Sequence, residues 1–217
     1  MARNPRKLAH PTRQARSEAT VGRLLDAAER LLQRKGWEGA TVPAIAREAR
    51  VAVGTVYKRF PDKDALLRLV YERFFERSRE RNRGALDPAG CRGVNLAPLV
   101  RALVSGMVTA YEENAALFQA LYLYADTHRD PAFRRRAEAL RREAFDGIGE
   151  LLLERRVEIR HPDPPRAIRV ALVTVASVLR VRAALGARWG ASGGSSPEEL
   201  KRELTRMVLA YLKVAER

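Results

Sequence analysis

The chain has little of what many catalytic, secreted or membrane proteins depend on. Its 217 residues include one cysteine, Cys91, so neither an intrachain disulfide nor a thiolate metal cluster is expected. The three histidines, His10, His128 and His161, lie far apart without metal-ligand spacing. No apolar run approaches the ~20 residues of a membrane helix, and the first residues lack the apolar segment of a signal peptide. We therefore expect a cytoplasmic protein with no membrane partner, metal or cofactor.

Motifs that accompany common enzyme chemistries are also missing. The sequence contains neither a Gly-x-Ser-x-Gly motif nor the glycine pattern of a dinucleotide site. The Gly/Ser-rich residues 190–196 lack the Gly-Lys-Ser/Thr ending of a phosphate loop and are read as a connector. Neighbouring carboxylates such as Glu112 and Glu113 are better explained as solvated. An enzyme remains the alternative hypothesis, but we expect no catalytic residues.

Positive charge is abundant. There are 41 lysines and arginines against 26 acidic residues, which gives a formal net charge of +15 and a pI near 10.9. This balance favours a nucleic-acid partner. Charge alone does not separate a sequence-specific regulator from a protein that compacts nucleic acid, because the two classes differ in specificity and share a steep salt dependence.

The first residues are basic and carry no acidic side chain before Glu18. Pro5 and Pro11 discourage a regular helix there. Residues 1–16 are consequently expected to form a flexible arm. The arm is either a disordered, solvated tail or a segment that lies along the minor groove of DNA. The basic residues are Arg3, Arg6, Lys7, Arg13 and Arg16.

Residues 41–64 predict two short helices, a tight turn and the start of a third helix. Thr41 can cap the first helix through its hydroxyl, and Pro43 falls in the first turn, where a missing N–H costs little. The second helix is expected over residues 53–60. Val56 and Phe60 are four residues apart and should face inward together.

The opposite side of this second helix is polar. Thr55, Lys58 and Arg59 should face outward, with Tyr57 beside them. Gly54 lacks a Cβ, so a nucleic-acid backbone or base edge can approach closely. Two helices joined by a short turn match the helix-turn-helix pattern, in which the second helix enters the major groove.

The surrounding motifs strengthen this interpretation. An aliphatic helix that ends at Gly36 and Trp37 is followed by Thr-x-x-x-Ile-Ala, Val-x-Val-Gly-Thr-x-Tyr-x-x-Phe and Asp-Lys-x-x-Leu. Over roughly residues 17–70 the chain closely resembles the DNA-binding domain of TetR-family transcriptional regulators. The resemblance implies a set of DNA-contacting residues. They are Thr41, Val53, Gly54, Thr55, Tyr57, Lys58 and Lys63.

Two residues depart from the family pattern. Arg50 occupies the turn where the family usually has glycine, so a left-handed backbone there carries a cost. Lys58 stands where histidine is common, which adds charge and can alter base preference.

Everything after the helix-turn-helix predicts helices, with no strand-like alternation. The fourth helix should run from Asp62 to the early 80s, and residues 82–95 should form a loop rich in glycine. Further helices are expected over 96–113, 115–127, 131–156, 164–189 and 197–215. The fold class is thus all-α, with a helix-turn-helix domain at 17–66 and a larger effector-binding and dimerisation domain at 67–217.

The last two helices have two possible roles. Residues 170–179 are apolar nearly all round and are expected to be buried on most sides. The helices at 164–189 and 197–215 could close the core of one subunit, or pair with the same helices of a second subunit. The resemblance favours a homodimer, which would present two recognition helices to half-sites roughly 34 Å apart.

The middle helices contain aromatic and polar residues that either fill a core or line a ligand cavity. The resemblance favours a cavity for a small-molecule effector whose identity the sequence leaves open. If Arg180 is buried, it needs an anionic partner from this protein or from the effector. The candidate lining residues are Met107, Tyr111, Phe118, Tyr122, Phe145, Thr174, Ser177 and Arg180.

A dense basic run lies in the helix expected at 131–156. Acidic Glu138 and Glu143 are interleaved with its arginines, which favours a solvated helix face with pairs four residues apart. The arginines are Arg134, Arg135, Arg136, Arg141 and Arg142.

Taken with the resemblance, these features imply a sequence-specific DNA-binding transcriptional regulator. The expected form is a dimeric repressor that a small-molecule effector releases from a palindromic operator on double-stranded DNA.

Overall fold

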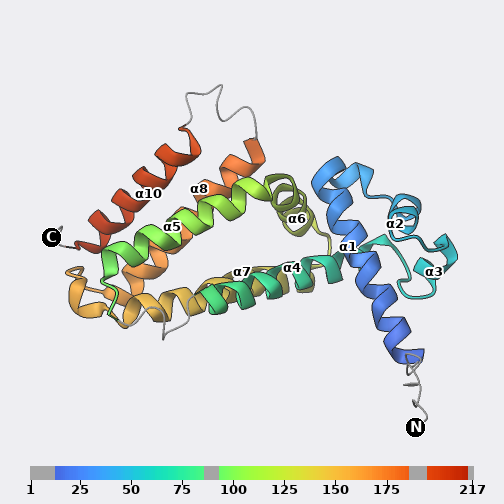
Figure 1. The fold of residues 1–217 in the computed structure, drawn as a ribbon, viewed down its shortest axis with the longest axis horizontal. Coiled ribbons are helices and arrows are strands. Elements are labelled where there is room, and N and C mark those ends of the chain that lie inside the picture. Colours follow the sequence, from blue (N-terminus) through green and yellow to red (C-terminus); the bar gives the residue numbers. More distant parts are fainter. Residues whose placement is uncertain (1–12, 86–92, 186–194, 215–217) are drawn as a thin grey trace, which may run out of the picture. The chain divides into compact units, whose positions relative to one another are not determined.

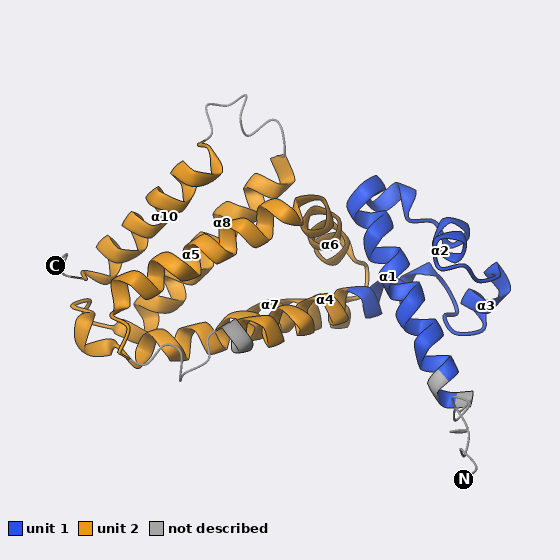
Figure 2. Ribbon diagram, viewed as in Figure 1, with its two compact units in different colours: residues 1–70 blue, residues 71–217 orange. Residues whose placement is uncertain are grey.

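The computed structural model describes residues 13–85, 93–185 and 195–214, which form helices and no strands (Figure 1). The chain divides into two compact units, Met1–Val70 and Tyr71–Arg217 (Figure 2). The boundary falls inside helix α4, Lys63–Ala85, four residues beyond the boundary expected after residue 66. Cys91 and residues 1–12 of the expected arm lie outside the described residues. Residues 13–16 of that arm already belong to helix α1.

The first unit is built on α1, Arg13–Gly39, with α2, Val42–Glu48, and α3, Val53–Tyr57, packed against one another. The helical path of α1 is interrupted at Gly36, whose φ of 62° is accessible to glycine at little cost. One apolar stripe of α1 joins residues of the later helices in a common core. The fully buried members include Leu24, Leu32, Ile45, Val56, Leu66 and Leu67.

The turn between α2 and α3 is left-handed at Arg50, where φ is 56°. The Val51 N–H donates to the Ala46 carbonyl at 3.0 Å, and the Arg50 N–H donates to the Arg47 carbonyl at 3.1 Å. This pair of hydrogen bonds is a Schellman motif, which satisfies the last carbonyls of α2. The motif therefore holds Arg50 in a conformation that glycine adopts more readily.

Helix α3 is shorter than expected. It ends at Tyr57, whereas the sequence predicted a helix through residue 60. Residues 58–60 continue as a turn in which the Phe60 N–H still donates to the Val56 carbonyl at 2.9 Å. The turn keeps Phe60 buried beneath the helix, as its spacing from Val56 predicted.

The second unit contains the rest of α4 and five further α-helices among the described residues. These are α5, Leu96–Glu113; α6, Ala115–Thr127; α7, Pro131–Leu153; α8, Pro164–Leu185; and α10, Pro197–Leu212. Their first residues coincide with the predictions. Three ends differ. Helix α4 extends through Ala85 into the expected loop, α7 ends at Leu153 and is followed by a 3-10 turn, Arg156–Glu158, and α10 ends at Leu212, three residues before its predicted end.

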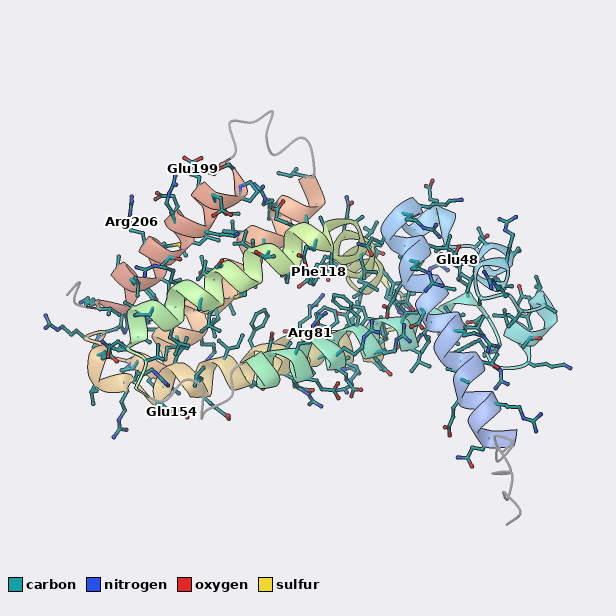
Figure 3. The ribbon with its side chains drawn as sticks, viewed as in Figure 1. Glu48, Arg81, Phe118, Glu154, Glu199 and Arg206 are labelled. Atoms are coloured by element: carbon teal, nitrogen blue, oxygen red, sulfur yellow. The ribbon has the colours of Figure 1, made fainter. Side chains whose placement is uncertain are left out.

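Helix α8 is central to this unit, since it contacts α5, α6, α7 and α10. On another side, α4 is joined to α7 by two hydrogen bonds. The Tyr71 hydroxyl donates to the Ala137 carbonyl at 3.3 Å, and the Asn82 amide donates to the Ala144 carbonyl at 2.7 Å. Aromatic rings of α4, α5 and α6 pack against one another, and Phe118 stacks on Tyr111 and meets Phe74 edge-on (Figure 3).

Candidate functional site

One face of α3 is exposed and carries side chains suited to contact with a polyanion. The exposed fractions are 40% for Val53 and 54% for Tyr57, and Lys58 is also exposed. Thr55 is half-buried. A Cβ added to Gly54 would meet no protein atom within 4 Å, so the space above this backbone is open. Tyr57 and Lys58 are exposed as the sequence predicted, whereas Thr55, predicted to face outward, is half-buried.

Arg59 differs from the expectation of an outward-facing side chain. It is half-buried, and its guanidinium donates to the hydroxyl of Ser17 on α1. An ion pair also joins α2 to the same helix, because Glu48 accepts from Arg30 at 3.0 Å and from Arg34 at 2.8 Å (Figure 3). These arginines hold the pKa of the Glu48 carboxyl below its usual value. Both contacts fix the short helices against α1.

Two further candidate residues lie at helix starts. Thr41 is exposed and caps α2, since its hydroxyl accepts from the Ala44 N–H at 3.3 Å. Lys63 begins α4, donates to the Trp37 carbonyl at 3.2 Å and lies 4.7 Å from the centroid of the Trp37 ring. Partial burial lowers the pKa of the Lys63 ammonium. An ammonium has three N–H donors, so Lys63 can keep its hydrogen bond to the Trp37 carbonyl and still donate to a phosphate oxygen.

The second unit contains two adjoining cavities. The larger, of about 560 Å³, lies between α7 and α8, and the smaller, of about 380 Å³, is lined by residues of α4, α5, α6 and α7. Tyr122 and Phe145 line both cavities. The two rings therefore form a wall shared by the two spaces.

The residues predicted to line one effector cavity are divided between these two. Met107, Tyr111 and Phe118 line only the smaller cavity, whereas Ser177 and Arg180 line only the larger one. Thr174 lines neither cavity. Its hydroxyl is half-buried and donates to the Val170 carbonyl at 2.8 Å, inside its own helix.

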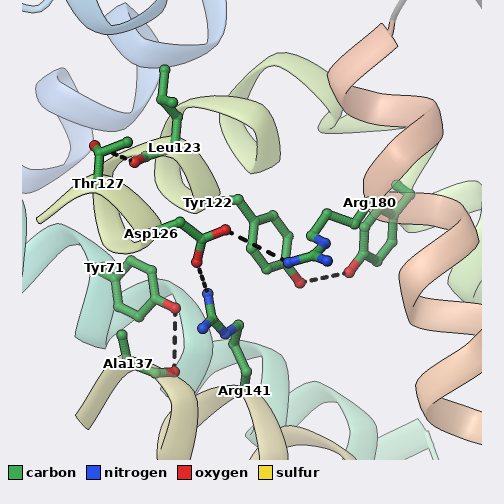
Figure 4. A network of polar contacts seen from close by, with 9 residues as sticks. Tyr71, Tyr122, Leu123, Asp126, Thr127, Ala137, Arg141 and Arg180 are labelled. Atoms are coloured by element: carbon green, nitrogen blue, oxygen red, sulfur yellow. Dashed lines mark hydrogen bonds and ion pairs between the residues drawn. The ribbon is translucent and has the colours of Figure 1, made fainter. Parts of the chain in front are cut away.

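The polar groups beside Tyr122 form a connected network (Figure 4). Its hydroxyl lies 2.9 Å from the hydroxyl of Tyr111. Asp126 accepts from Arg141 at 3.0 Å and forms a longer ion pair with Arg180 at 3.6 Å. The guanidinium carbons of these two arginines lie 5.5 and 5.9 Å from the centroid of the Tyr122 ring. The sequence predicted an anionic partner for Arg180 only if its side chain were buried. The side chain is 47% exposed, and its partner is Asp126, which the sequence did not identify.

Arg141 departs from the solvated helix face predicted for the basic run of α7. Its side chain is only 22% exposed. Arg136 and Arg142 are exposed as predicted. Arg142 pairs with Glu138 at 3.7 Å, four residues away, whereas Arg136 pairs with Glu143 at 3.2 Å, seven residues away rather than the predicted four. Sequence spacing could not separate Arg141 from its neighbours, because its partner lies on a different helix.

Burial raises the pKa of three tyrosines of the second unit, Tyr71, Tyr111 and Tyr122, of which the last two line the smaller cavity. The phenolate form loses hydration in this environment, so their hydroxyls remain hydrogen-bonding groups at neutral pH. The smaller cavity thus combines a largely apolar wall and neutral hydroxyl groups with one charged residue, Arg81, whereas several charged residues of both signs border the larger one.

Helix α8 also has an exposed apolar face, contrary to the prediction that residues 170–179 are buried on most sides. The exposed fraction of Val173 is 59%, and Val170, Val181 and Leu185 are exposed as well. Met207 and Tyr211 of α10 are similarly exposed. A monomer rarely leaves neighbouring helices with this much apolar surface in water, which makes the face a candidate interface.

A helix-turn-helix with an exposed polar second helix, followed by a larger helical unit with cavities, defines the class of helix-turn-helix regulatory proteins. The sequence model named "Bacterial regulatory proteins, tetR family" matches residues 24–70. A second model, "Tetracyclin repressor-like, C-terminal domain", matches residues 95–212, which is more than half of the chain. The protein belongs to the TetR family.

The curated relatives resemble only part of the chain. The HTH-type transcriptional repressor KstR of Rhodococcus jostii is 39% identical over 83 residues, which are 37% of this chain and 39% of that repressor. The chain spans half or less of the length of the curated relatives it matches.

Solved structures share the fold over nearly the whole chain. A structure from Mesorhizobium loti assigned to the TetR family of transcriptional regulators has a TM-score of 0.73 and 21% identity, covering 94% of this chain and 98% of that one. The regulator FadR of Bacillus subtilis, in complex with stearoyl-CoA, has a TM-score of 0.62 and 18% identity, covering 88% and 96%. Among the described residues, no helix has the length and apolar character needed to span a bilayer.

Proposed function

We propose that the protein is a sequence-specific transcriptional repressor that binds a palindromic operator as a homodimer and leaves it when a small molecule binds. The observation that carries this proposal is the anchoring of α3. Val56 and Phe60 are buried beneath the helix, while Tyr57 and Lys58 remain exposed on its surface. A buried anchor and an exposed polar face are what a recognition helix needs to enter the major groove in a fixed orientation.

The DNA contacts divide into two kinds. Contacts to base edges and the groove floor come from α3, where the open backbone at Gly54 permits close approach. Phosphate contacts come from the helix starts, where a hydroxyl or an ammonium lies beside exposed N–H groups. Val53, Gly54, Thr55, Tyr57 and Lys58 belong to the first kind, and Thr41 and Lys63 to the second.

The homodimer forms through the exposed apolar face of α8 and α10. A two-fold axis brings the same face of two subunits together, so Val170, Val181 and Tyr211 of each would lose their contact with water. The same symmetry places two recognition helices on successive turns of one DNA face, which explains why the operator should be palindromic.

The effector binds in the second unit, where the two cavities have volumes typical of small-molecule sites. Helix α4 lines the smaller cavity and also extends into the first unit. A ligand that shifts α4 changes the separation of the two recognition helices and weakens DNA binding. Such coupling is reciprocal, so operator DNA weakens ligand binding by the same factor.

Selection of bound fragments from random duplex DNA tests this function. The full-length chain should enrich a palindrome whose half-sites are separated by about one helical turn. A preference below about tenfold over random duplex would instead identify a protein that compacts nucleic acid, a role that the net charge of +15 would also suit.

A further inference from the structure

One carboxylate, that of Asp126, is shared by two guanidinium groups. Arg141 is the closer partner at 3.0 Å and is mostly buried, whereas Arg180 is 47% exposed and lies 3.6 Å away without a hydrogen bond. Exposed ion pairs contribute little to stability. The contact between Asp126 and Arg180 is therefore the weaker of the two and the easier to replace (Figure 4).

The larger cavity is polarised along α8. Its α8 face has an arginine near each end, Arg169 and Arg180, with apolar and small side chains between them. A Cβ on Gly149 would lie 3.9 Å from Ile168. This part of α7 therefore lies beside the end of α8 that contains Arg169. Asp146 and Glu150 of α7 accordingly belong to that end of the cavity.

The opposite end is cationic. Arg141, Arg142 and Arg180 gather there against the carboxylates of Asp126 and Glu138. These three arginines and two carboxylates have a net charge of +1. The Arg169 end has two carboxylates and one arginine, a net charge of −1. An anionic group entering the cavity is consequently attracted to the end that contains Arg180.

We propose that the effector is an amphipathic anion, and that its acidic group replaces Asp126 as the partner of Arg180. This inference rests on the proposed function, because it names the ligand class and the regulatory contact of that same effector site. The apolar body of the ligand fits the cavity wall made by Phe145, Leu172 and Val173. Displacement of the Tyr122 and Phe145 rings would open the smaller cavity, whose wall is largely apolar, to a longer body.

Loss of the contact between Asp126 and Arg180 can affect the DNA-binding unit through ring contacts between α6 and α4. Asp126 and Tyr122 lie on α6, whose Phe118 ring packs edge-on against Phe74 of α4 at 5.0 Å between ring centroids. Tyr122 makes a similar contact with Phe75 at 6.2 Å. Release of α6 from Arg180 on α8 therefore changes the surface on which α4 packs.

The experiment compares two probes of equal chain length, dodecanoate and the neutral dodecan-1-ol, by calorimetric titration of the full-length protein. Arg180→Gln should weaken dodecanoate binding about tenfold and leave dodecanol binding unchanged, because only the acid loses a charged partner. Asp126→Asn should strengthen dodecanoate binding about threefold, since it removes the competing carboxylate. Arg166→Gln, an exposed arginine of α8 that lines neither cavity, is the matched control.

Three results would overturn the inference: equal weakening of both probes by Arg180→Gln, no gain from Asp126→Asn, or no binding of either probe to the unaltered protein. Arg180→Lys, which keeps the charge, should retain part of the preference for dodecanoate. The operator selection is done without ligand, so it separates the two hypotheses. A palindrome without dodecanoate preference removes only this inference, and dodecanoate preference without a palindrome removes only the repressor function.

Discussion

Lys63 links the start of α4 to the end of α1 through a single residue, Trp37. Its ammonium donates to the Trp37 carbonyl at 3.2 Å and lies 4.7 Å from the centroid of the indole ring. The contact restricts a long, flexible side chain before any DNA is bound. Less conformational entropy is then lost when a phosphate oxygen takes one of the remaining N–H donors.

The substitution Lys63→Ala should weaken binding to all duplexes by a similar factor. A phosphate contact carries no sequence information, so the preference among sequences should stay the same. The slope of log affinity against log salt should become shallower by about 0.9, the value for one phosphate neutralised. Fluorescence-anisotropy titrations over a range of salt concentrations measure both effects.

Lys201→Ala is the control for lost charge, because Lys201 lies on α10 and pairs with Glu198 at 2.7 Å. It should leave the salt slope nearly unchanged. If Lys63→Ala instead reduced binding at one base position of the operator, Lys63 would be a base contact and its assignment to a phosphate would be wrong.

The substitution Tyr57→Ala should abolish operator binding without destabilising the fold. Tyr57 is 54% exposed, so its removal should change the free energy of unfolding by no more than about 0.5 kcal/mol. Anisotropy titration and thermal unfolding are the two measurements. Tyr57→Phe separates the ring from the hydroxyl. A large loss of helical content in Tyr57→Ala would show that the ring has a structural role.

The substitution Arg50→Gly should stabilise the first unit. Relief of the left-handed backbone at φ 56° gains roughly 1–2 kcal/mol, and the greater freedom of glycine in the unfolded chain offsets about half of it. A net gain of about 0.5–1 kcal/mol raises the melting temperature by a few degrees in a protein of this size.

Arg47→Gly provides the control for Arg50→Gly. It removes the same charge from an exposed position inside α2, where glycine costs about 1 kcal/mol. The two variants should therefore shift the melting temperature in opposite directions. Destabilisation by both would mean that the Arg50 side chain makes a contact that outweighs its backbone strain.

Helix starts were the most predictable part of the fold, because they depend on local chemistry. Asp130 before Pro131 and Ser196 before Pro197 cap α7 and α10 through their side chains, as the sequence pattern indicates. Helix ends were less predictable. The end of α3 at Tyr57 depends on the burial of Phe60 in a turn, which requires the rest of the unit to be in place.

The effector region shows where sequence patterns reach their limit. The aromatic residues were compatible with a core or a cavity, and the family resemblance favoured one cavity but not its division by Tyr122 and Phe145. Asp126 was missed for a similar reason, since an ion pair between α6 and α8 leaves no spacing rule in the sequence. Residues 170–179 of α8 were predicted to be buried on most sides because they are apolar nearly all round. That pattern does not show which side a neighbouring helix covers, so the exposed face could not be located from the sequence.

The substitution Val181→Glu should convert the dimer into a monomer. A carboxylate in an apolar helix interface loses its hydration without gaining a partner, which costs several kcal/mol. Sedimentation measures the assembly, and affinity for the palindromic operator should fall with it. Val157→Glu places the same charge at a residue that is 89% exposed on the 3-10 turn. It should remain a dimer, and dissociation of both variants would point to a different interface.

Alkaline pH should destabilise the protein through its buried tyrosines. Burial raises the pKa of Tyr71, Tyr111 and Tyr122 above the usual 10.0, so the folded state holds these protons more tightly than the unfolded chain. Their contribution to the free energy of unfolding is complete below pH 10 and is lost as pH rises further. Urea unfolding at increasing pH measures this loss, and ultraviolet absorbance reports phenolate formation.

Tyr122→Phe tests whether the buried tyrosines cause this loss of stability, because it removes one of the three titrating phenol groups. The decline of the free energy of unfolding above pH 10 should become shallower, by at most about 1.4 kcal/mol per pH unit. If the three tyrosines formed phenolate while helicity remained intact, water would reach their hydroxyls in the folded state, and the apolar character inferred for the smaller cavity would be wrong.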